Sequence, residues 1–287
     1  MEMETSKKSL KILGTRVDQV LLEDSLEIAR SKILNGEKCE QIVTPYSEFF
    51  VEARKNQKFQ EVINKSFLSI PDGVGVVFAA KFLEESRSKK GKIQKVLVFL
   101  KDLVQIPFYR FMKKENFPIK ERVSGVDFVK EMLVWLTKNN IPAFFLGAMP
   151  KIGEKAYENL KKEIPDLKVS GIYSGSPDEN EKDKIVEMIN NSRAKFLVVC
   201  FSPPKQEVWI DSVLDKLETV KIAIGAGGTL DFFSGKKKRA PKLFRRIGLE
   251  WLWRLMIEPK RIKRIWNATF VFLSMLLKES LNGKNSK

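Results

Sequence analysis

The polar residues that could do chemistry in this sequence stand singly, each at the end of a short apolar run. Asp72 is a lone carboxylate between Pro71 and Gly73, in the sequence IPDGVG. The chain contains no histidine, which excludes Ser-His-Asp and Cys-His catalysis, histidine general bases and most zinc sites. Carboxylates remain among the groups that can move a proton. Pro-Asp-Gly is also common turn chemistry, however, and taken by itself Asp72 is best explained as a turn residue.

Other polar residues occupy the same kind of position. They are Thr44 in VTPYSE, Arg122 and Asp127 in ERVSGVDF, Gln206 and Glu207 in SPPKQE, and Asp231 after GAGGTL. The glycine-rich turn is not GxGxxG, and neither a P-loop nor an Asp-x-Asp pair occurs. If a diphosphate leaves in the reaction, arginines, lysines and backbone N–H groups must therefore meet its charge, and no metal site is predicted.

Apolar strand-like runs alternate with amphipathic stretches along the chain. This alternation predicts an α/β fold with a Rossmann-like, mainly parallel sheet and helices on both faces. Ligands of such folds bind at the carboxyl ends of the strands, where the polar residues above are expected. Strands are predicted within 39–47, 67–73, 141–148, 194–204 and 220–228, and helices over 48–65, from 74 onward, over 152–164 and over 205–217.

Composition narrows the class of protein and its partners. The 287 residues are 43% hydrophobic and 31% charged, which is ordinary for a folded protein, but the net charge of +16 points to a polyanionic partner. Cys39 and Cys200 are isolated, as expected for core residues in a reducing compartment. The N-terminus has no signal-peptide pattern, and the longest uncharged run is 13 residues, against about 20 for a membrane span. We therefore expect a cytoplasmic protein.

Two segments depart from the α/β alternation. Residues 86–120 form an amphipathic insertion, which is either a helix packed on its own domain or on another subunit, or an interfacial membrane helix. Residues 236–264 hold 12 Lys or Arg against two Glu, a net charge of +10, with Trp251 and Trp253 among them. Basic, tryptophan-containing stretches of this kind suit an anionic membrane surface. The predicted domains are 1–232, catalytic, and 233–287, a helical basic appendage that associates with the membrane.

Six motifs occur in an order that resembles one family. They are TPYSEFFVEARK, IPDGVGVVFAAKFL, ERVSGVDF, SPPKQEVWI, EPKRIKR and the block AIGAGGTLDFFSGKKKRAPKLFRRIGLEWLWRL that precedes it. Together they are similar to the WecG/TagA/CpsF glycosyltransferases over about residues 15–264.

The resemblance implies an inverting, metal-independent hexosyltransferase without a cofactor. It would move a sugar, commonly N-acetylmannosamine or its uronic acid, from a UDP-sugar to an N-acetylglucosamine carried on undecaprenyl diphosphate. The enzyme would act as a peripheral protein on the inner face of the bacterial membrane, in the synthesis of teichoic acid, common antigen, capsule or exopolysaccharide. Family members are often oligomers, so a homo-oligomer is possible.

The resemblance also implies roles for individual residues. Asp72 would be the general base that deprotonates the acceptor hydroxyl. The substrate-binding residues would be Thr44, Tyr46, Arg122, Gln206, Asp231, Arg254, Arg261 and Arg264, with the last three arginines closing over the site from the C-terminal appendage. Tyr46 stands where the family usually has asparagine, which puts a polar contact to the sugar in question.

Two alternatives come from other classes of protein. A catalytically degenerate member of the family could serve as a scaffold in polysaccharide assembly. A basic nucleic-acid-binding protein would use the C-terminal aromatic residues for stacking, but no nucleic-acid-binding motif is present, and we expect no nucleic acid partner.

Overall fold

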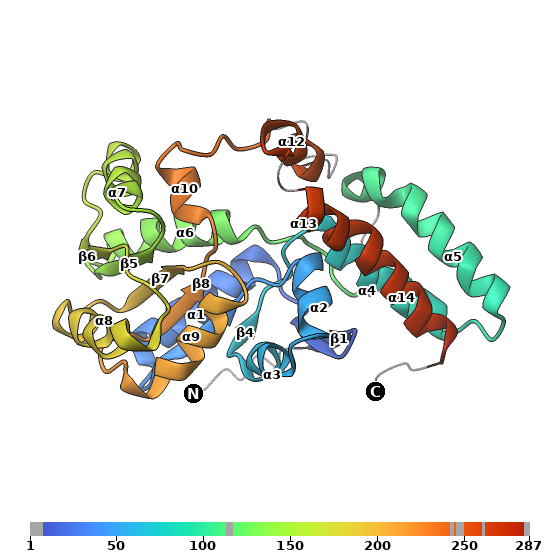
Figure 1. The fold of residues 1–287 in the computed structure, drawn as a ribbon, viewed down its shortest axis with the longest axis horizontal. Coiled ribbons are helices and arrows are strands. Elements are labelled where there is room, and N and C mark those ends of the chain that lie inside the picture. Colours follow the sequence, from blue (N-terminus) through green and yellow to red (C-terminus); the bar gives the residue numbers. More distant parts are fainter. Residues whose placement is uncertain (1–7, 113–116, 242–243, 245–249, 260–261, 284–287) are drawn as a thin grey trace.

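A six-stranded, wholly parallel β-sheet forms the centre of the protein (Figure 1). The structure is a computed structural model that describes residues 8–112, 117–241, 244, 250–259 and 262–283. Because every pair of neighbouring strands is parallel, all six strands end at the same edge, and the segments that follow them meet there. Across the sheet the order is β4 (Leu68–Ser69), β3 (Glu40–Val43), β8 (Ile222–Gly225), β7 (Phe196–Cys200), β5 (Ala143–Gly147) and β6 (Val169–Tyr173).

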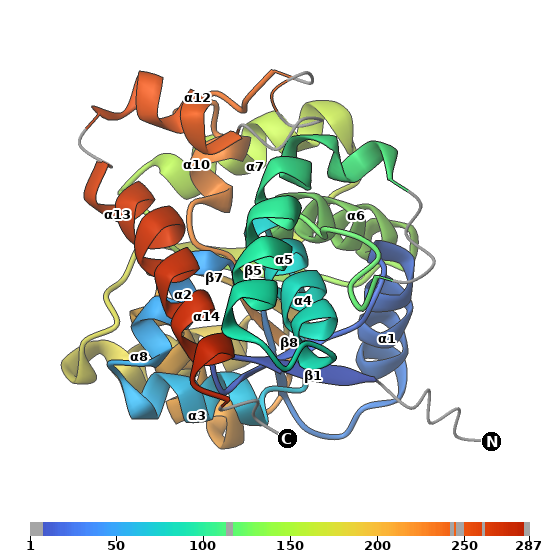
Figure 2. The same ribbon diagram turned by 90° about the vertical axis from the view of Figure 1, so that its right-hand side faces the viewer.

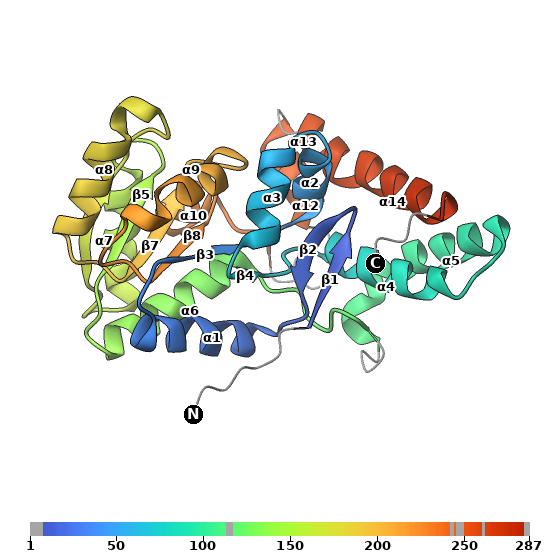
Figure 3. The ribbon, with the colours of Figure 1, turned by 90° about the horizontal axis from the view of Figure 1, so that it is seen from below.

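Helices cover both faces of the sheet, as Figure 3 shows. This arrangement confirms the predicted α/β fold with a Rossmann-like parallel sheet. One face carries α1 (Leu22–Asn35), α6 (Gly125–Lys138) and α7 (Ile152–Glu163). The other carries α8 (Glu179–Asn191) and α9 (Lys205–Val213), with α2 (Ser47–Ala53) and α3 (Gln57–Lys65) packed beside β3.

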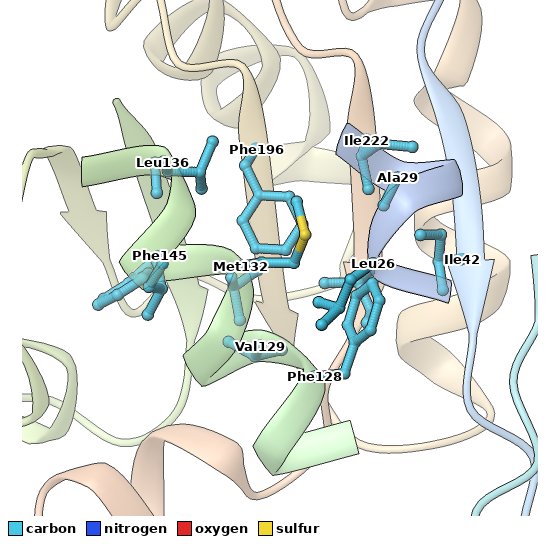
Figure 4. Close-up of a cluster of buried hydrophobic side chains, with 14 of the residues drawn as sticks. Leu26, Ala29, Ile42, Phe128, Val129, Met132, Leu136, Phe145, Phe196 and Ile222 are labelled. Atoms are coloured by element: carbon cyan, nitrogen blue, oxygen red, sulfur yellow. The ribbon is translucent and has the colours of Figure 1, made fainter. Parts of the chain in front are cut away.

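The central strands are apolar throughout because helices cover both of their faces. All five residues of β7 are buried. Phe196 and Val198 pack on the side of α1 and α6. Leu197 and Val199 pack on the side of α8 and α9. Figure 4 shows the first of these clusters, where Phe128 of α6 and Phe196 both point into the core.

The structure differs from the sequence predictions in its helices and in two outer elements. The single helix predicted over 48–65 is wrong, because the chain breaks after α2 and restarts at α3. Asn56 causes the restart, since its side-chain oxygen accepts the N–H of Phe59 at 3.0 Å and caps α3. The elements without a counterpart among the sequence predictions include the strand β6, the helices α1, α6 and α8, and an antiparallel hairpin of β1 (Ser9–Ile12) and β2 (Thr15–Asp18).

A group of three helices stands at the end of the molecule beside β4 (Figure 2). They share one apolar cluster that includes Phe82, Phe99 and Phe272. The predicted insertion therefore packs on its own chain through one face of its helix. The three helices are α4 (Val74–Arg87), α5 (Lys92–Gln105), followed by the 3-10 turn η1 (Ile106–Phe111), and α14 (Phe272–Leu281).

The C-terminal part of the chain returns to this group of helices. Phe272 and Leu276 of α14 are 1% and 0% exposed in the cluster shared with α4. The division between 1–232 and 233–287 stays a prediction. Within the residues that the structure describes, no helix combines the length and apolar character needed to cross a bilayer. Before α14 the chain forms α10 (Thr229–Phe233), α12 (Glu250–Ile257), α13 (Ile262–Trp266) and a π-helical turn η4 (Asn267–Val271).

Candidate active site

A cavity of about 770 Å³ lies at the carboxyl edge of the sheet. Its walls come from the segments that follow β3, β4, β5, β7 and β8, together with the start of α6 and residues of α10, α13 and η4. Ligand pockets commonly measure about 300–1,000 Å³, and open α/β sheets bind ligands at this edge. The cavity is therefore the place to look for the site's chemistry.

Asp72 lies on the cavity wall in the loop between β4 and α4. The peptide bond between Pro71 and Asp72 is hydrogen-bonded to two neighbouring segments. The carbonyl of Pro71 accepts the N–H of Val123 at 2.9 Å, and the N–H of Asp72 donates to the carbonyl of Pro45 at 3.0 Å. Gly73 has a φ of +99°, a backbone conformation that residues other than glycine rarely adopt. Pro71 and Gly73 thus hold the carboxylate at the cavity.

The first turn of α6 contacts both Asp72 and Thr44 through Gly125. The N–H of Gly125 donates to Oδ2 of Asp72 at 3.4 Å. Thr44, just after β3, is 8% exposed and packs so closely on Gly125 that an added Cβ would lie 3.4 Å from its Oγ1. Arg122 precedes this turn and also lines the cavity. The N-terminus of a helix favours negative charge nearby, and here it lies against a carboxylate.

Tyr46, Glu48 and Arg264 form a hydrogen-bonded group between α2 and α13. Arg264 donates from Nε and Nη2 to Oε2 of Glu48 at 3.1 and 2.9 Å, and from Nη2 to the Tyr46 oxygen at 2.8 Å. The Tyr46 hydroxyl donates to Glu48 at 2.9 Å. Burial, with the nearby Glu48 charge, raises the pKa of Tyr46, so the phenol stays protonated. This group ties the C-terminal helices to the α/β part of the chain.

Arg264 stays protonated and positively charged in this group. Burial opposes that charge, but the hydrogen bond to Glu48 and the neighbouring charges outweigh it and raise the pKa of Arg264. A planar guanidinium that is always charged is well suited to bind a phosphate through two hydrogen bonds.

Further cations reach the cavity from the chain that follows α10. Lys237 is hydrogen-bonded to Asp231, and Nζ of Lys236 lies 3.9 Å from the same carboxylate. Arg239 reaches the first turn of α6, where its Nη2 donates to Asp127 at 2.6 Å. The cationic side chains that line the cavity, among the described residues, are Arg122, Lys236, Lys237, Arg239 and Arg264.

Gln206 and Glu207 form a buried pair under the glycine-rich turn after β8. Gln206 accepts the N–H of Gly227 at 3.0 Å through Oε1, and its Nε2 donates to Oε1 of Glu207 at 2.6 Å. Burial raises the pKa of Glu207 to about 7, against an ordinary value of 4.5. The absence of a side chain at Gly225 leaves space for this pair, since an added Cβ would lie 2.7 Å from Oε1 of Glu207. Gln206 therefore lines the cavity, and Glu207 lies behind it.

The structure brings most of the residues predicted as a site to this one cavity. Arg261 and the side chain of Arg254 lie outside the described residues. No group of three or more His, Cys, Asp or Glu side chains is placed to hold a metal ion in the described part of the chain. The predicted residues that line the cavity are Thr44, Tyr46, Asp72, Arg122, Gln206, Asp231 and Arg264.

Sequence reasoning missed or could not rank several residues of the cavity. Glu48 stands inside a helix, where an acidic residue is unremarkable. Lys236, Lys237 and Arg239 belong to a long basic stretch in which nothing distinguishes the lysines and arginines that face a cavity from those that face solvent. Glu207 does not line the cavity, and nothing in SPPKQE indicates that this carboxyl group is buried.

Two kinds of comparison relate this chain to known proteins. The sequence profile of the glycosyl transferase WecG/TagA/CpsF family matches residues 10–101 and 104–286. The chain is also similar to the N-acetylglucosaminyldiphosphoundecaprenol N-acetyl-beta-D-mannosaminyltransferase of Staphylococcus aureus strain MRSA252. The two are 26% identical over 288 residues, which cover 100% of this chain and 99% of the relative.

A relative with the same name from Bacillus spizizenii strain W23 is 27% identical over 251 residues. That alignment covers 88% of this chain and 84% of the relative. The similarity therefore extends across nearly the whole chain, including the C-terminal helices.

Proposed function

Because the chain belongs to the WecG/TagA/CpsF family of glycosyl transferases, we propose that it transfers N-acetylmannosamine, or a closely related sugar, from a UDP-sugar to an N-acetylglucosamine on undecaprenyl diphosphate. The relatives' name supports the sugar and the acceptor. The observation that carries the proposal is the position of Asp72, a carboxylate on the wall of a cavity that five cationic side chains border among the described residues.

Asp72 acts as the general base. It removes the proton from the acceptor hydroxyl, and the hydroxyl oxygen forms a bond to the anomeric carbon of the sugar as the bond from that carbon to the UDP oxygen breaks. Attack from the side opposite the leaving group inverts the anomeric centre. A positioned general base contributes about 10²–10⁴-fold to such a reaction.

The cationic side chains stabilise the departing diphosphate. Charge develops on the bridging oxygen as UDP leaves, and preorganised cations stabilise that charge in the transition state. Lys237 and Arg239 are paired with Asp231 and Asp127 in this structure. A diphosphate offers them a second, more highly charged partner without a divalent metal, so we propose that transfer proceeds in the presence of EDTA.

We also propose that the enzyme works at the inner face of the cell membrane. Its lipid-linked acceptor lies there, and the net charge of +10 in residues 236–264 suits an anionic surface. The product would enter teichoic acid or another cell-surface polysaccharide.

A screen of sugar nucleotides tests this proposal. UDP-ManNAc, UDP-ManNAcA, UDP-glucose and UDP-GlcNAc are each incubated with a short-chain GlcNAc-diphosphate-lipid in EDTA, and the products are identified by mass. We expect a disaccharide-diphosphate-lipid from UDP-ManNAc or UDP-ManNAcA. If none of the four yields product or UDP, the chain is a scaffold of the family, and strict dependence on Mg²⁺ or Mn²⁺ would contradict the role given to the cations.

A further inference from the structure

The outer face of α5 exposes a line of large apolar side chains. They recur three or four residues apart, which places them on one side of the helix. They continue onto η1, so the line runs the length of the segment. The side chains are Ile93, 77% exposed, Leu97, 61%, Leu100, 50%, Val104, 71%, and Phe108, 61%. We call these five residues the α5 stripe.

The opposite face of α5 is firmly attached to the rest of the chain. Val98 and Phe99 are buried against α4. Asp102 forms a buried ion pair with Lys81 of α4, and Lys95 donates to the carbonyl of Ser280 in α14 at 2.6 Å. The α5 stripe is therefore not left exposed by a loosely placed helix. Packing of the opposite face of α5 fixes the helix with the α5 stripe exposed.

Exposed lysines gather just before the α5 stripe, and Lys101 beside it is paired with Glu85 of α4. The lysines that precede the α5 stripe are Lys89, Lys90 and Lys92. The only acidic residue of the helix, Asp102, is buried. A bilayer rich in anionic lipid has apolar acyl chains beneath negatively charged headgroups. An apolar line preceded by lysines is complementary to such a surface.

The chain reaches the cavity between the last two residues of the α5 stripe, which do not line it themselves. Ile106, at the start of η1, lines the cavity together with Ile265 of α13 and Ala268 of η4. The C-terminal elements expose apolar side chains of their own, among them Trp266 and Phe270. Figure 2 shows α5 and the α13–α14 helices lying along the same end of the molecule. A surface that touched both would have the cavity at its edge.

The size of the α5 stripe favours a bilayer over a second copy of the chain. A helix of 14 residues is about 21 Å long and about 10 Å wide, so its outer face offers about 200 Å². A stable protein interface buries about 800 Å² on each partner. An interfacial helix needs only one apolar face that reaches the acyl chains.

We propose that the α5 stripe is a membrane-docking surface, which inserts into the headgroup–acyl boundary of an anionic bilayer and turns the cavity toward it. The inference rests on the proposed function only for the identity of the lipid-linked acceptor that would enter there. It adds a second contact, in the middle of the chain, to the basic C-terminal segment.

Flotation with vesicles of phosphatidylglycerol and phosphatidylcholine tests the proposal. The double substitution Leu97→Gln and Val104→Gln removes apolar contact without changing charge and keeps good helix formers. We expect it to lower the ratio of bound to free protein at least about tenfold. Leu34→Gln is a matched control, since Leu34 is as exposed as Leu97, at 61%, but lies at the end of α1. It should float like the unchanged protein.

Several results would overturn the proposal. One is a double variant that floats like the unchanged protein, and another is an unchanged protein that does not bind these vesicles. A dimer, seen by sedimentation velocity, that the double substitution splits would show that a second copy covers the α5 stripe. Circular dichroism verifies that each variant is folded. Vesicle binding needs neither sugar nucleotide nor acceptor, so its failure is distinct from a failure of the proposed reaction.

Discussion

At the scale of single residues, Glu207 is a carboxyl group that the fold keeps away from water. It is 0% exposed, and its Oε2 has no hydrogen-bond partner among the described residues. Burial raises its pKa to about 7, against 4.5 for an ordinary glutamate. The neutral acid is therefore favoured in the folded state, and its charged form costs free energy there.

A dependence of stability on pH follows from this shift. Below pH 4.5 Glu207 is protonated in both states. As the pH rises toward 7, the unfolded chain releases the proton while the folded chain retains it, so the free energy of unfolding falls. Relative to the unchanged protein, Glu207→Gln should be more stable at pH 8 than at pH 5 by up to about 3 kcal/mol. Urea unfolding at the two pH values measures this, and an equal effect at both would refute the buried-acid description.

Tyr46 lines the cavity, and its hydroxyl is hydrogen-bonded within the protein. It accepts from Arg264 and donates to Glu48. Tyr46→Phe removes both hydrogen bonds, each worth about 1 kcal/mol, and should cost about 2 kcal/mol of stability. Tyr157→Phe is the control, because its hydroxyl donates over a longer 3.4 Å to the Leu167 carbonyl. Equal losses in urea unfolding would mean that Tyr46 does not hold Arg264.

At the scale of elements, a buried ion pair joins α4 to α5. The Asp102 side chain is fully buried beside Lys81. Asp102→Asn would leave Glu85 as the charged partner of Lys81 among the described residues and should cost about 3 kcal/mol. Asp183→Asn breaks the exposed pair with Lys216 and should change stability hardly at all. Urea unfolding compares the two, and similar losses would show that the buried pair is not special.

The elements that the sequence predicts are those with an unbroken apolar run or a clear helical period. β5, β7 and β8 are buried at every position, so their pattern is plain. β6 lies at the edge of the sheet, is only partly buried and contains Gly171. The β2 strand TRVD carries Arg16 and Asp18, which pair with each other. These two strands depend on tertiary contacts, and their own sequences lack a pattern that predicts a strand.

At the scale of the whole molecule, the sequence predicts the part of the site that the parallel sheet alone brings together. A parallel sheet brings the ends of its strands together, so Thr44, Asp72 and Gln206 could be expected to meet. Arg239 reaches the cavity from the C-terminal chain, and Glu48 meets Arg264 there because of the path of that chain. That path depends on how α13 and α14 dock, and no local pattern encodes it.

The C-terminal helices should be necessary for folding. A chain that ends at residue 231 lacks Phe272 and Leu276, which are buried with α4. Losing two such side chains costs about 5–10 kcal/mol, comparable with the whole stability of a typical domain. We expect this chain to lose its cooperative thermal transition, whereas one that ends at residue 283 keeps it. A truncated chain as stable as the full one would instead support a boundary at residue 232.

The most direct measurement of the central claim is single-turnover transfer by Asp72→Asn, beside binding of the sugar nucleotide. The asparagine keeps the shape of the side chain but cannot take a proton. If Asp72 is the general base, the transfer rate should fall about 10²–10⁴-fold, while the dissociation constant of the UDP-sugar changes by less than about threefold. Asp183→Asn, far from the cavity, should transfer at the unchanged rate. Near-normal transfer by Asp72→Asn would contradict the account.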